Sequence, residues 1–142
     1  MRFWDSSAVV PLLVPEQASE ALRRLHSGDP VVIAWWGAGV ECVSAVARAE
    51  RVGRLSAAAT TEGLRRLVAL TRGWHEIEPS EEVRESAKRL LRVHDLRAAD
   101  ALHLAAAFVA AEGRPASLPF VCLDDRLRIA ADREGFAVIP AA

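Results

Sequence analysis

The chain begins Met1-Arg2-Phe3-Trp4-Asp5-Ser6-Ser7, and this stretch decides its fold. A short apolar run ends at one carboxylate, Asp5, and two hydroxyl residues lead into the helix-compatible run Ala8–Val14. A strand that ends in Asp and turns at once into a helix places that carboxylate on the rim of a sheet. Open α/β sheets hold their ligands at this rim, beyond the carboxyl ends of the strands. The opening therefore predicts that Asp5 belongs to a ligand site to which the rest of the chain brings further groups.

Length and composition narrow the class of protein. The 142 residues, of which 51% are hydrophobic, indicate one globular domain with a real core, and we expect a single domain over residues 1–142. No apolar run reaches the ~18 residues of a membrane helix, and we see no secretory signal. Cys42 and Cys122 lie inside apolar runs, which predicts buried reduced thiols and a cytoplasmic protein. The net charge of -1 argues against a protein that simply coats nucleic acid, but it is compatible with an enzyme that cuts it.

Short strands and helices alternate along the chain. Strands are expected over residues 2–4, 31–34, 74–77, 119–123 and 136–139. Helices are expected over residues 8–14, 16–27, 39–52, 56–71, 80–93, 98–111 and 124–134. The strands are continuous apolar runs, as parallel sheets covered on both faces require. The pattern predicts an α/β fold, a three-layer α/β/α sandwich with a parallel sheet of four to five strands.

Two of the expected helices carry apolar residues at helical spacing. The helix over residues 39–52 places Val40, Val43 and Ala47 on one side. The helix over residues 56–71 is expected to turn Leu64, Leu67 and Val68 inward, with Ser56 as its N-cap.

Four acidic residues stand out by their position. Asp5 and Asp124 each follow an expected strand, so a parallel sheet brings both to the same rim. Asp100 lies in the first turn of the very apolar helix over residues 98–111, and Glu41 lies early in the helix after the second strand.

Each of these acids also has a simpler structural interpretation. Asp5 and Asp124 can serve as helix N-caps, Asp100 can interact with its helix dipole, and Glu41 can face solvent. The helical pattern breaks near His94, and Asp95 directly follows that break. We therefore expect Asp95 to be a better helix cap than Asp100. If Asp5 is a ligand, the cap of the first helix passes to Ser6 or Ser7.

The four acids taken together indicate a cation site. Carboxylates crowded at one rim raise each other's pKa unless a cation neutralises them. Ligands that are all oxygen favour Mg²⁺ or Mn²⁺. His26, His75, His94 and His103 share no HxH or HxxxH spacing, which argues against zinc, and His103 is expected to be a packed core residue. The chain also lacks a GxxxxGK[ST] phosphate loop and a GxSxG nucleophile elbow.

Three segments of the chain resemble PIN-domain ribonucleases, in particular VapC-type toxins of type II toxin–antitoxin systems. Asp5-Ser6-Ser7-Ala8-Val9-Val10 resembles the opening of that family, and Leu96-Arg97-Ala98-Ala99-Asp100-Ala101-Leu102-His103-Leu104-Ala105 resembles its most recognisable motif. Phe120-Val121-Cys122-Leu123-Asp124-Asp125-Arg126-Leu127 resembles its third acidic motif, and Glu41 falls where the family places a Glu. The resemblance runs from the first residue to about Ile139. The chain departs from the family at Trp35 and Trp36, where we expect Ser or Thr, and at Cys122-Leu123, where a Thr-Tyr pair is usual.

The resemblance implies a metal-dependent endoribonuclease. Asp5 and Asp100 would hold one Mg²⁺ or Mn²⁺, and Glu41 and Asp124 would complete the site or hold a second ion. Ser6 or Ser7 would hydrogen-bond a ligand carboxylate or the substrate phosphate. The implied substrate is structured RNA, with transfer RNA as the expected class.

The same resemblance implies protein partners, a cognate antitoxin and a second copy of the chain in a homodimer, and no membrane. Three apolar segments are candidate docking surfaces if they are exposed. They are Ala18, Ala21, Leu22 and Leu25; the pair Trp35 and Trp36; and Leu64, Leu67 and Val68.

Two other classes of protein are also compatible with the sequence. A Mg²⁺-dependent phospho-aspartyl domain also places an Asp at a strand end. Receiver domains need a Lys near the acids, however, and Lys88 lies in mid-helix, while haloacid-dehalogenase-like phosphatases need a second Asp where this chain has Ser7. The other class is a catalytically inactive PIN-like interaction module, which keeps the fold without cutting RNA.

Overall fold

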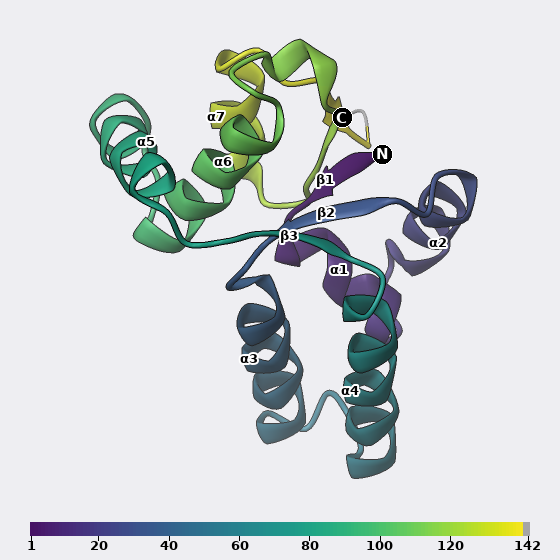
Figure 1. Cartoon of the computed structure of the whole chain (residues 1–142). Coiled ribbons are helices and arrows are strands. Elements are labelled where there is room, and N and C mark those ends of the chain that lie inside the picture. The colour runs from purple at the N-terminus through teal and green to yellow at the C-terminus, as the bar shows by residue number, and fades with distance from the viewer. Residues whose placement is uncertain (141–142) are drawn as a thin grey trace.

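A five-stranded parallel sheet lies at the centre of the computed structural model, which describes residues 1–140 (Figure 1). The strands are β1 (Arg2–Trp4), β2 (Val32–Trp35), β3 (His75–Ile77), β4 (Phe120–Val121) and β5 (Val138–Ile139). Their order is β3-β2-β1-β4-β5, so β1 is the middle strand, and Phe3 pairs with both Ile33 and Phe120. Because the strands are parallel, their carboxyl ends meet at one edge, where Asp5 follows β1.

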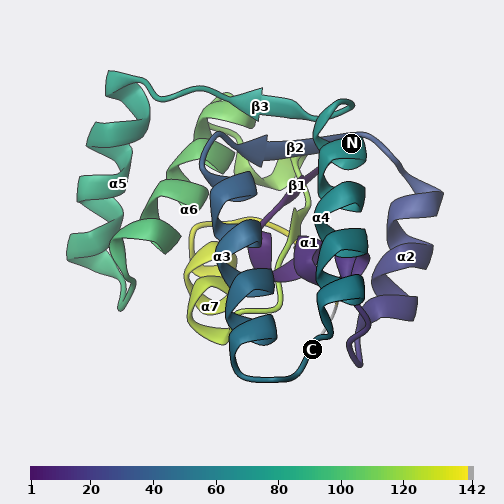
Figure 2. The same cartoon turned by 90° about the horizontal axis from the view of Figure 1, so that it is seen from below.

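Helices cover both faces of the sheet. They are α1 (Ser6–Leu13), α2 (Ser19–Gly28), α3 (Ala38–Arg51), α4 (Ala57–Thr71), α5 (Glu81–Val93), α6 (Ala98–Ala110) and α7 (Asp125–Arg133), with a short 3₁₀ turn, η1 (Pro115–Ser117). In Figures 1 and 2, α1, α3 and α4 lie on one side of the sheet and α5, α6 and α7 on the other. The predicted three-layer α/β/α fold is confirmed.

The alternation of side chains along the strands divides the core into two parts. Phe3 packs into the cluster formed with α5, α6 and α7, and its ring stacks on that of Phe120 with centroids 5.3 Å apart. Trp4, the next residue, packs into the cluster formed with α1 to α4. Both side chains are fully buried, so β1 is fixed from both faces. The residue after it, Asp5, has little freedom of position.

The helix caps differ from two predictions. Asp5 itself caps α1, because its backbone is extended and its Oδ2 accepts a 3.1 Å hydrogen bond from the Ser7 backbone N–H. The transfer of this cap to Ser6 or Ser7 was therefore wrong. Asp95 does not cap α6, whose N-cap residue is Arg97, and Asp100 at the third helical position accepts from the Arg97 backbone N–H at 3.4 Å.

The structure shows which apolar side of two helices is buried. In α3 the buried residues are Ala38, Cys42 and Val46, whereas Val40 is 71% exposed. The apolar side marked by Val40 and Val43 therefore faces away from the core. In α4 Leu67 is buried and Leu64 partly buried, as expected, but Val68 is exposed. The spacing alone could not distinguish these apolar faces, because both helices are apolar on more than one side.

The segment between β2 and α3 depends on a glycine. The Trp35 indole is buried and lies against Gly37, where a Cβ would be 2.7 Å from the Trp35 Nε1 atom. Only glycine leaves room for the ring at this point. The chain then enters α3, and Glu41 lies in its first turn.

Two further predictions concern membrane-spanning helices and the state of the cysteines. None of the helices described within residues 1–140 is long and apolar enough to cross a bilayer. Cys42 and Cys122 are buried, free thiols, as predicted, and burial raises the pKa of each.

Candidate active site

Asp5 is held at the carboxyl edge of the sheet by several short contacts. The residue is 3% exposed, and its Oδ2 accepts from the backbone N–H and the hydroxyl of Ser7. The Cys122 thiol also lies 3.6 Å from this oxygen. The Ser7 hydroxyl in turn accepts from the Leu123 backbone N–H at 2.9 Å, which ties the end of β1 to the end of β4. The carboxylate is thus oriented by two strands and one helix.

His103 connects Asp5 to Glu41. Its Nε2 lies 2.6 Å from Glu41 Oε2, and its Nδ1 lies 3.4 Å from Asp5 Oδ1 without meeting hydrogen-bond geometry. The ring is fully buried. Burial lowers the pKa of His103, but the Glu41 hydrogen bond and the negative charges of Asp5 and Glu41 outweigh it and raise the pKa overall. This arrangement favours a positively charged imidazole between two carboxylates.

An acidic pocket opens above this pair. It has a volume of about 460 Å³, and its lining residues are Glu41, Arg97, Ala99, Asp100, Asp124, Asp125 and Arg126. Asp124 caps α7 by accepting from the Leu127 backbone N–H at 3.0 Å. Burial raises the pKa of Asp100, and the charges of Asp124 and Asp5 raise it further. The carboxylates are therefore near enough to repel one another.

The structure places the predicted site residues at one edge of the sheet. Glu41, Asp100 and Asp124 line the same pocket. Asp5 lies apart from that lining and reaches Glu41 through His103. The Ser6 hydroxyl donates to Glu41 Oε1 at 3.3 Å, and the Ser7 hydroxyl donates to Asp5, so both contact carboxylates. Within residues 1–140 no three His, Cys, Asp or Glu side chains already surround one point as metal ligands.

Several residues of this site were not predicted as site residues from the sequence. His103 was expected to be a packed residue, and it is, but it also contacts two of the acids. The signal was its spacing, one helical turn after Asp100. Arg97 and Arg126 line the pocket and had no signal, because arginines are frequent along the whole chain.

We predict that His103→Ala destabilises the fold strongly. The substitution leaves two carboxylates facing each other and opens a cavity, so the free energy of unfolding should fall by about 3 kcal/mol. Denaturant unfolding followed by circular dichroism measures this. His75→Ala, which removes an exposed histidine from β3, is the control and should change stability by less than about 0.5 kcal/mol. Equal stability of the two variants would show that the imidazole does not hold the site together.

No family model matches the chain. Two solved structures share its fold. The crystal structure of PAE2754 from Pyrobaculum aerophilum matches with a TM-score of 0.66 and 20% identity, covering 96% of this chain and 81% of that one. The crystal structure of FitAcB from Neisseria gonorrhoeae matches with a TM-score of 0.62 and 20% identity, covering 97% of this chain and 96% of that one.

Two curated sequences are closer. Ribonuclease VapC45 of Mycobacterium tuberculosis (strain CDC 1551 / Oshkosh) is 32% identical over 139 residues, which is 98% of this chain and 94% of the relative. Ribonuclease VapC49 of M. tuberculosis (strain ATCC 25618 / H37Rv) matches with the same identity and coverage. The identity to each relative extends over nearly the full length of both sequences. The chain therefore belongs to the VapC family of PIN-domain ribonucleases, the toxins of toxin–antitoxin systems.

Proposed function

We propose that this chain is a metal-dependent endoribonuclease, the toxin of a toxin–antitoxin pair, with residues 1–142 as one PIN-like domain. The observation that carries the proposal is the acidic pocket, in which Glu41, Asp100 and Asp124 meet above Asp5 and His103. Membership of the VapC family supplies the reaction class. Structured RNA, with transfer RNA as the expected class, is the substrate that the family resemblance implies.

The side chains around the pocket fit a divalent cation. The donor set is all carboxylate oxygen, the chemistry that Mg²⁺ and Mn²⁺ prefer. The raised pKa of Asp100, caused by burial and by the charges of Asp124 and Asp5, shows that negative charge is crowded there. We propose that Asp5 and Asp100 hold the ion and that Glu41 and Asp124 complete the site. Such an ion would supply a water of lowered pKa and would offset charge on the phosphodiester.

The chain's own residues orient the acids and receive the RNA. Ser7 and the amino end of α1 fix Asp5, while Ser6 and His103 fix the two oxygens of Glu41. Arg97 and Arg126 place positive charge on the pocket lining, where a phosphate approaches the carboxylates. An open pocket at a sheet edge suits an unpaired nucleotide better than a duplex, because only unpaired bases can be splayed out and read.

We predict that Asp100→Asn and Asp5→Asn each abolish RNA cleavage. Asparagine keeps the capping geometry but loses the charge that binds a cation, so the fold should persist while the rate falls by at least about a hundredfold. Cleavage of purified transfer RNA is measured with Mg²⁺, with Mn²⁺ and with a chelator, which should also stop the reaction.

The matched control is Asp125→Asn, which removes a carboxylate from the same pocket without touching a proposed ligand. It should cut at close to the wild-type rate. Wild-type activity in the Asp100 or Asp5 variant would overturn the site assignment. An inactive wild-type protein would favour the interaction-module alternative.

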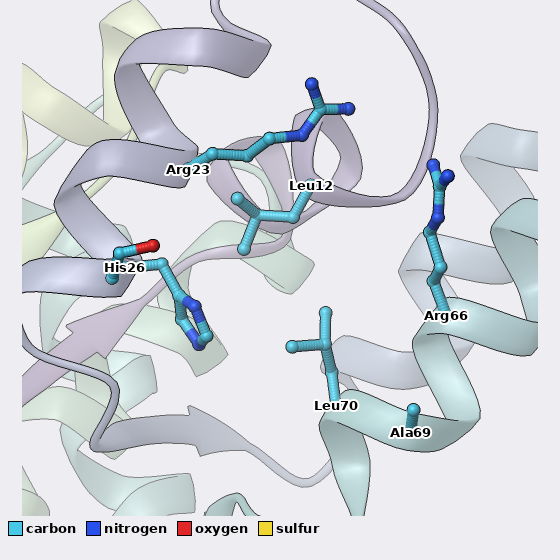
Figure 3. A pocket seen from close by; sticks show the side chains of 7 residues that line it. Leu12, Arg23, His26, Arg66, Ala69 and Leu70 are labelled. Atoms are coloured by element: carbon cyan, nitrogen blue, oxygen red, sulfur yellow. The ribbon is translucent and has the colours of Figure 1, made fainter.

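We further propose a cognate antitoxin as a partner. Of the three predicted docking segments, Leu22, Trp35 and Leu67 are buried, whereas Trp36 and Val68 are exposed. A pocket of about 430 Å³ lies between α1, α2 and α4. In Figure 3, Leu12, His26 and Leu70 point toward one another from these helices, and Arg23 and Arg66 stand at the rim. An apolar floor with a basic rim suits an antitoxin segment that carries apolar and acidic side chains.

We predict that Arg23→Glu weakens antitoxin binding by roughly tenfold or more, because it places a negative charge at the rim that would face acidic side chains. Isothermal titration calorimetry with the cognate antitoxin measures this. Arg24→Glu is the control, since Arg24 is not in the pocket lining and pairs with Glu20. If both reversals leave the affinity unchanged, the antitoxin binds elsewhere.

We also propose that the protein forms a homodimer and that it acts in the cytoplasm. Val40 and Val43 are exposed on α3, and Trp36, in the turn before this helix, is 54% exposed, so the three form an exposed apolar stripe at the start of α3. A second copy of the same stripe would cover it. The two free thiols are compatible with a reducing compartment.

We predict that Val40→Asp shifts the protein to a monomer, because it places a charge in the centre of the stripe. Size-exclusion chromatography with light scattering measures the mass. Val52→Asp alters an exposed valine at the other end of α3 and should leave the mass unchanged. A monomeric wild-type protein would overturn the dimer.

A further inference from the structure

Several arginines near the acidic pocket lack the ion pairs that other arginines make. On the outer helices Arg24, Arg65 and Arg84 pair with glutamates one turn away. By contrast, Arg97 and Arg133 make no ion pair within residues 1–140, and Arg126 has only a 3.8 Å contact with the exposed Asp95. An exposed pair of this kind contributes little. Positive charge is therefore left over beside the site, although the whole chain carries a net charge of -1.

A second hollow adjoins the acidic pocket. It has a volume of about 210 Å³ and is lined by His94, Asp95, Arg126, Ile129, Ala130 and Arg133. Arg126 lines both this hollow and the acidic pocket, so the two adjoin at this side chain. We call this second hollow the α7 hollow.

The α7 hollow presents cations at a regular spacing. Arg126 and Arg133 are seven residues apart, which puts them on one side of the helix, about 10 Å apart along its axis. Ile129 lies between them and is 53% exposed, while Ala130 beneath is buried. Two guanidinium groups at this separation can contact two different phosphates of one strand, with an apolar side chain between them for a sugar or a base.

The wall of the α7 hollow is held in place. Glu134, just beyond α7, accepts from Arg89 at 3.0 and 3.3 Å and lies 2.7 Å from His94 Nε2. Its negative charge is thus neutralised and does not oppose an anion. At the other end Arg128 donates to the carbonyl oxygens of Cys122 and Pro140, both at 2.6 Å. The helix that carries Arg126 and Arg133 is therefore anchored at both ends.

We propose that the α7 hollow is a phosphate-binding subsite for the RNA strand, in which Arg126 and Arg133 contact phosphates beside the one that is cut. This inference rests on the ribonuclease function proposed above. A pocket lined by four carboxylates repels an RNA backbone, and arginines on its flank supply the compensating attraction. Arginine also matches the geometry of phosphate oxygens with two parallel hydrogen bonds.

The test compares RNA binding at several KCl concentrations. The Asp100→Asn protein is used throughout so that a labelled single-stranded RNA oligonucleotide stays intact, and fluorescence anisotropy gives the affinity. Adding Arg126→Gln and Arg133→Gln should weaken binding roughly tenfold at low salt. The slope of log affinity against log salt should fall by about 1.4, since each phosphate contact on a single strand contributes about 0.7.

The control is the pair Arg51→Gln and Arg54→Gln. Both residues are exposed and, within residues 1–140, unpaired, and they lie at the α3–α4 turn, far from the sheet edge (Figure 1). This pair removes the same charge and should leave the slope unchanged. Equal slopes for the two pairs would overturn the subsite. Ile129→Ala should weaken binding without changing the slope, and an unchanged affinity would remove Ile129 from the subsite.

The outcomes separate this proposal from the ribonuclease function. If the unsubstituted protein cuts RNA while the Arg126 and Arg133 changes leave RNA binding unaltered, the subsite is wrong and the function stands. If the unsubstituted protein cuts no RNA, both fail. If the two changes weaken antitoxin binding but not RNA binding, the α7 hollow belongs to a protein partner and the RNA subsite is overturned.

Discussion

A buried carboxylate at the end of the middle strand is the constraint on which the rest of the structure depends. Removing a carboxylate from water is costly unless hydrogen bonds or opposite charges compensate. Asp5 is compensated by Ser7, by the amino end of α1 and by the neighbouring His103. Each of these contacts also fixes a second element: Ser7 ties β4 through Leu123, and His103 ties α6 to Glu41 on α3. The fold and the site are therefore organised by the same group.

Most of the fold was accessible from the sequence because the strands are short apolar runs separated by clear helix signals. The order of elements and their parallel connection follow from that alternation. Ser56 was correctly predicted as the cap of α4. In the structure its hydroxyl accepts a hydrogen bond from the Ala59 backbone N–H, three residues further on. The cap of α1 was misjudged for a general reason. One carboxylate can cap a helix and face a site at once, so the two roles of Asp5 were not alternatives.

The candidate site was less accessible than the fold. Asp100 and Asp124 could be named because they sit at the starts of helices beside a sheet edge, where position carries information. The role of His103 depends on contacts across the structure, and a single spacing does not reveal them. The exposed face of α3 could not be predicted from the sequence for a different reason. Val40 and Val46 are equally apolar, and only the packing of α3 decides which of them is covered.

The close approach of Trp35 to Gly37 has a consequence for how the chain can vary. The indole occupies the space of any side chain at position 37, so the two positions are linked by volume. A larger residue at 37 requires a smaller one at 35 or a shift of the indole, because its Cβ would lie 2.7 Å from the Trp35 Nε1 atom. Natural sequences that replace Trp35 with a small residue are free to lose the glycine. The pair should therefore covary among relatives.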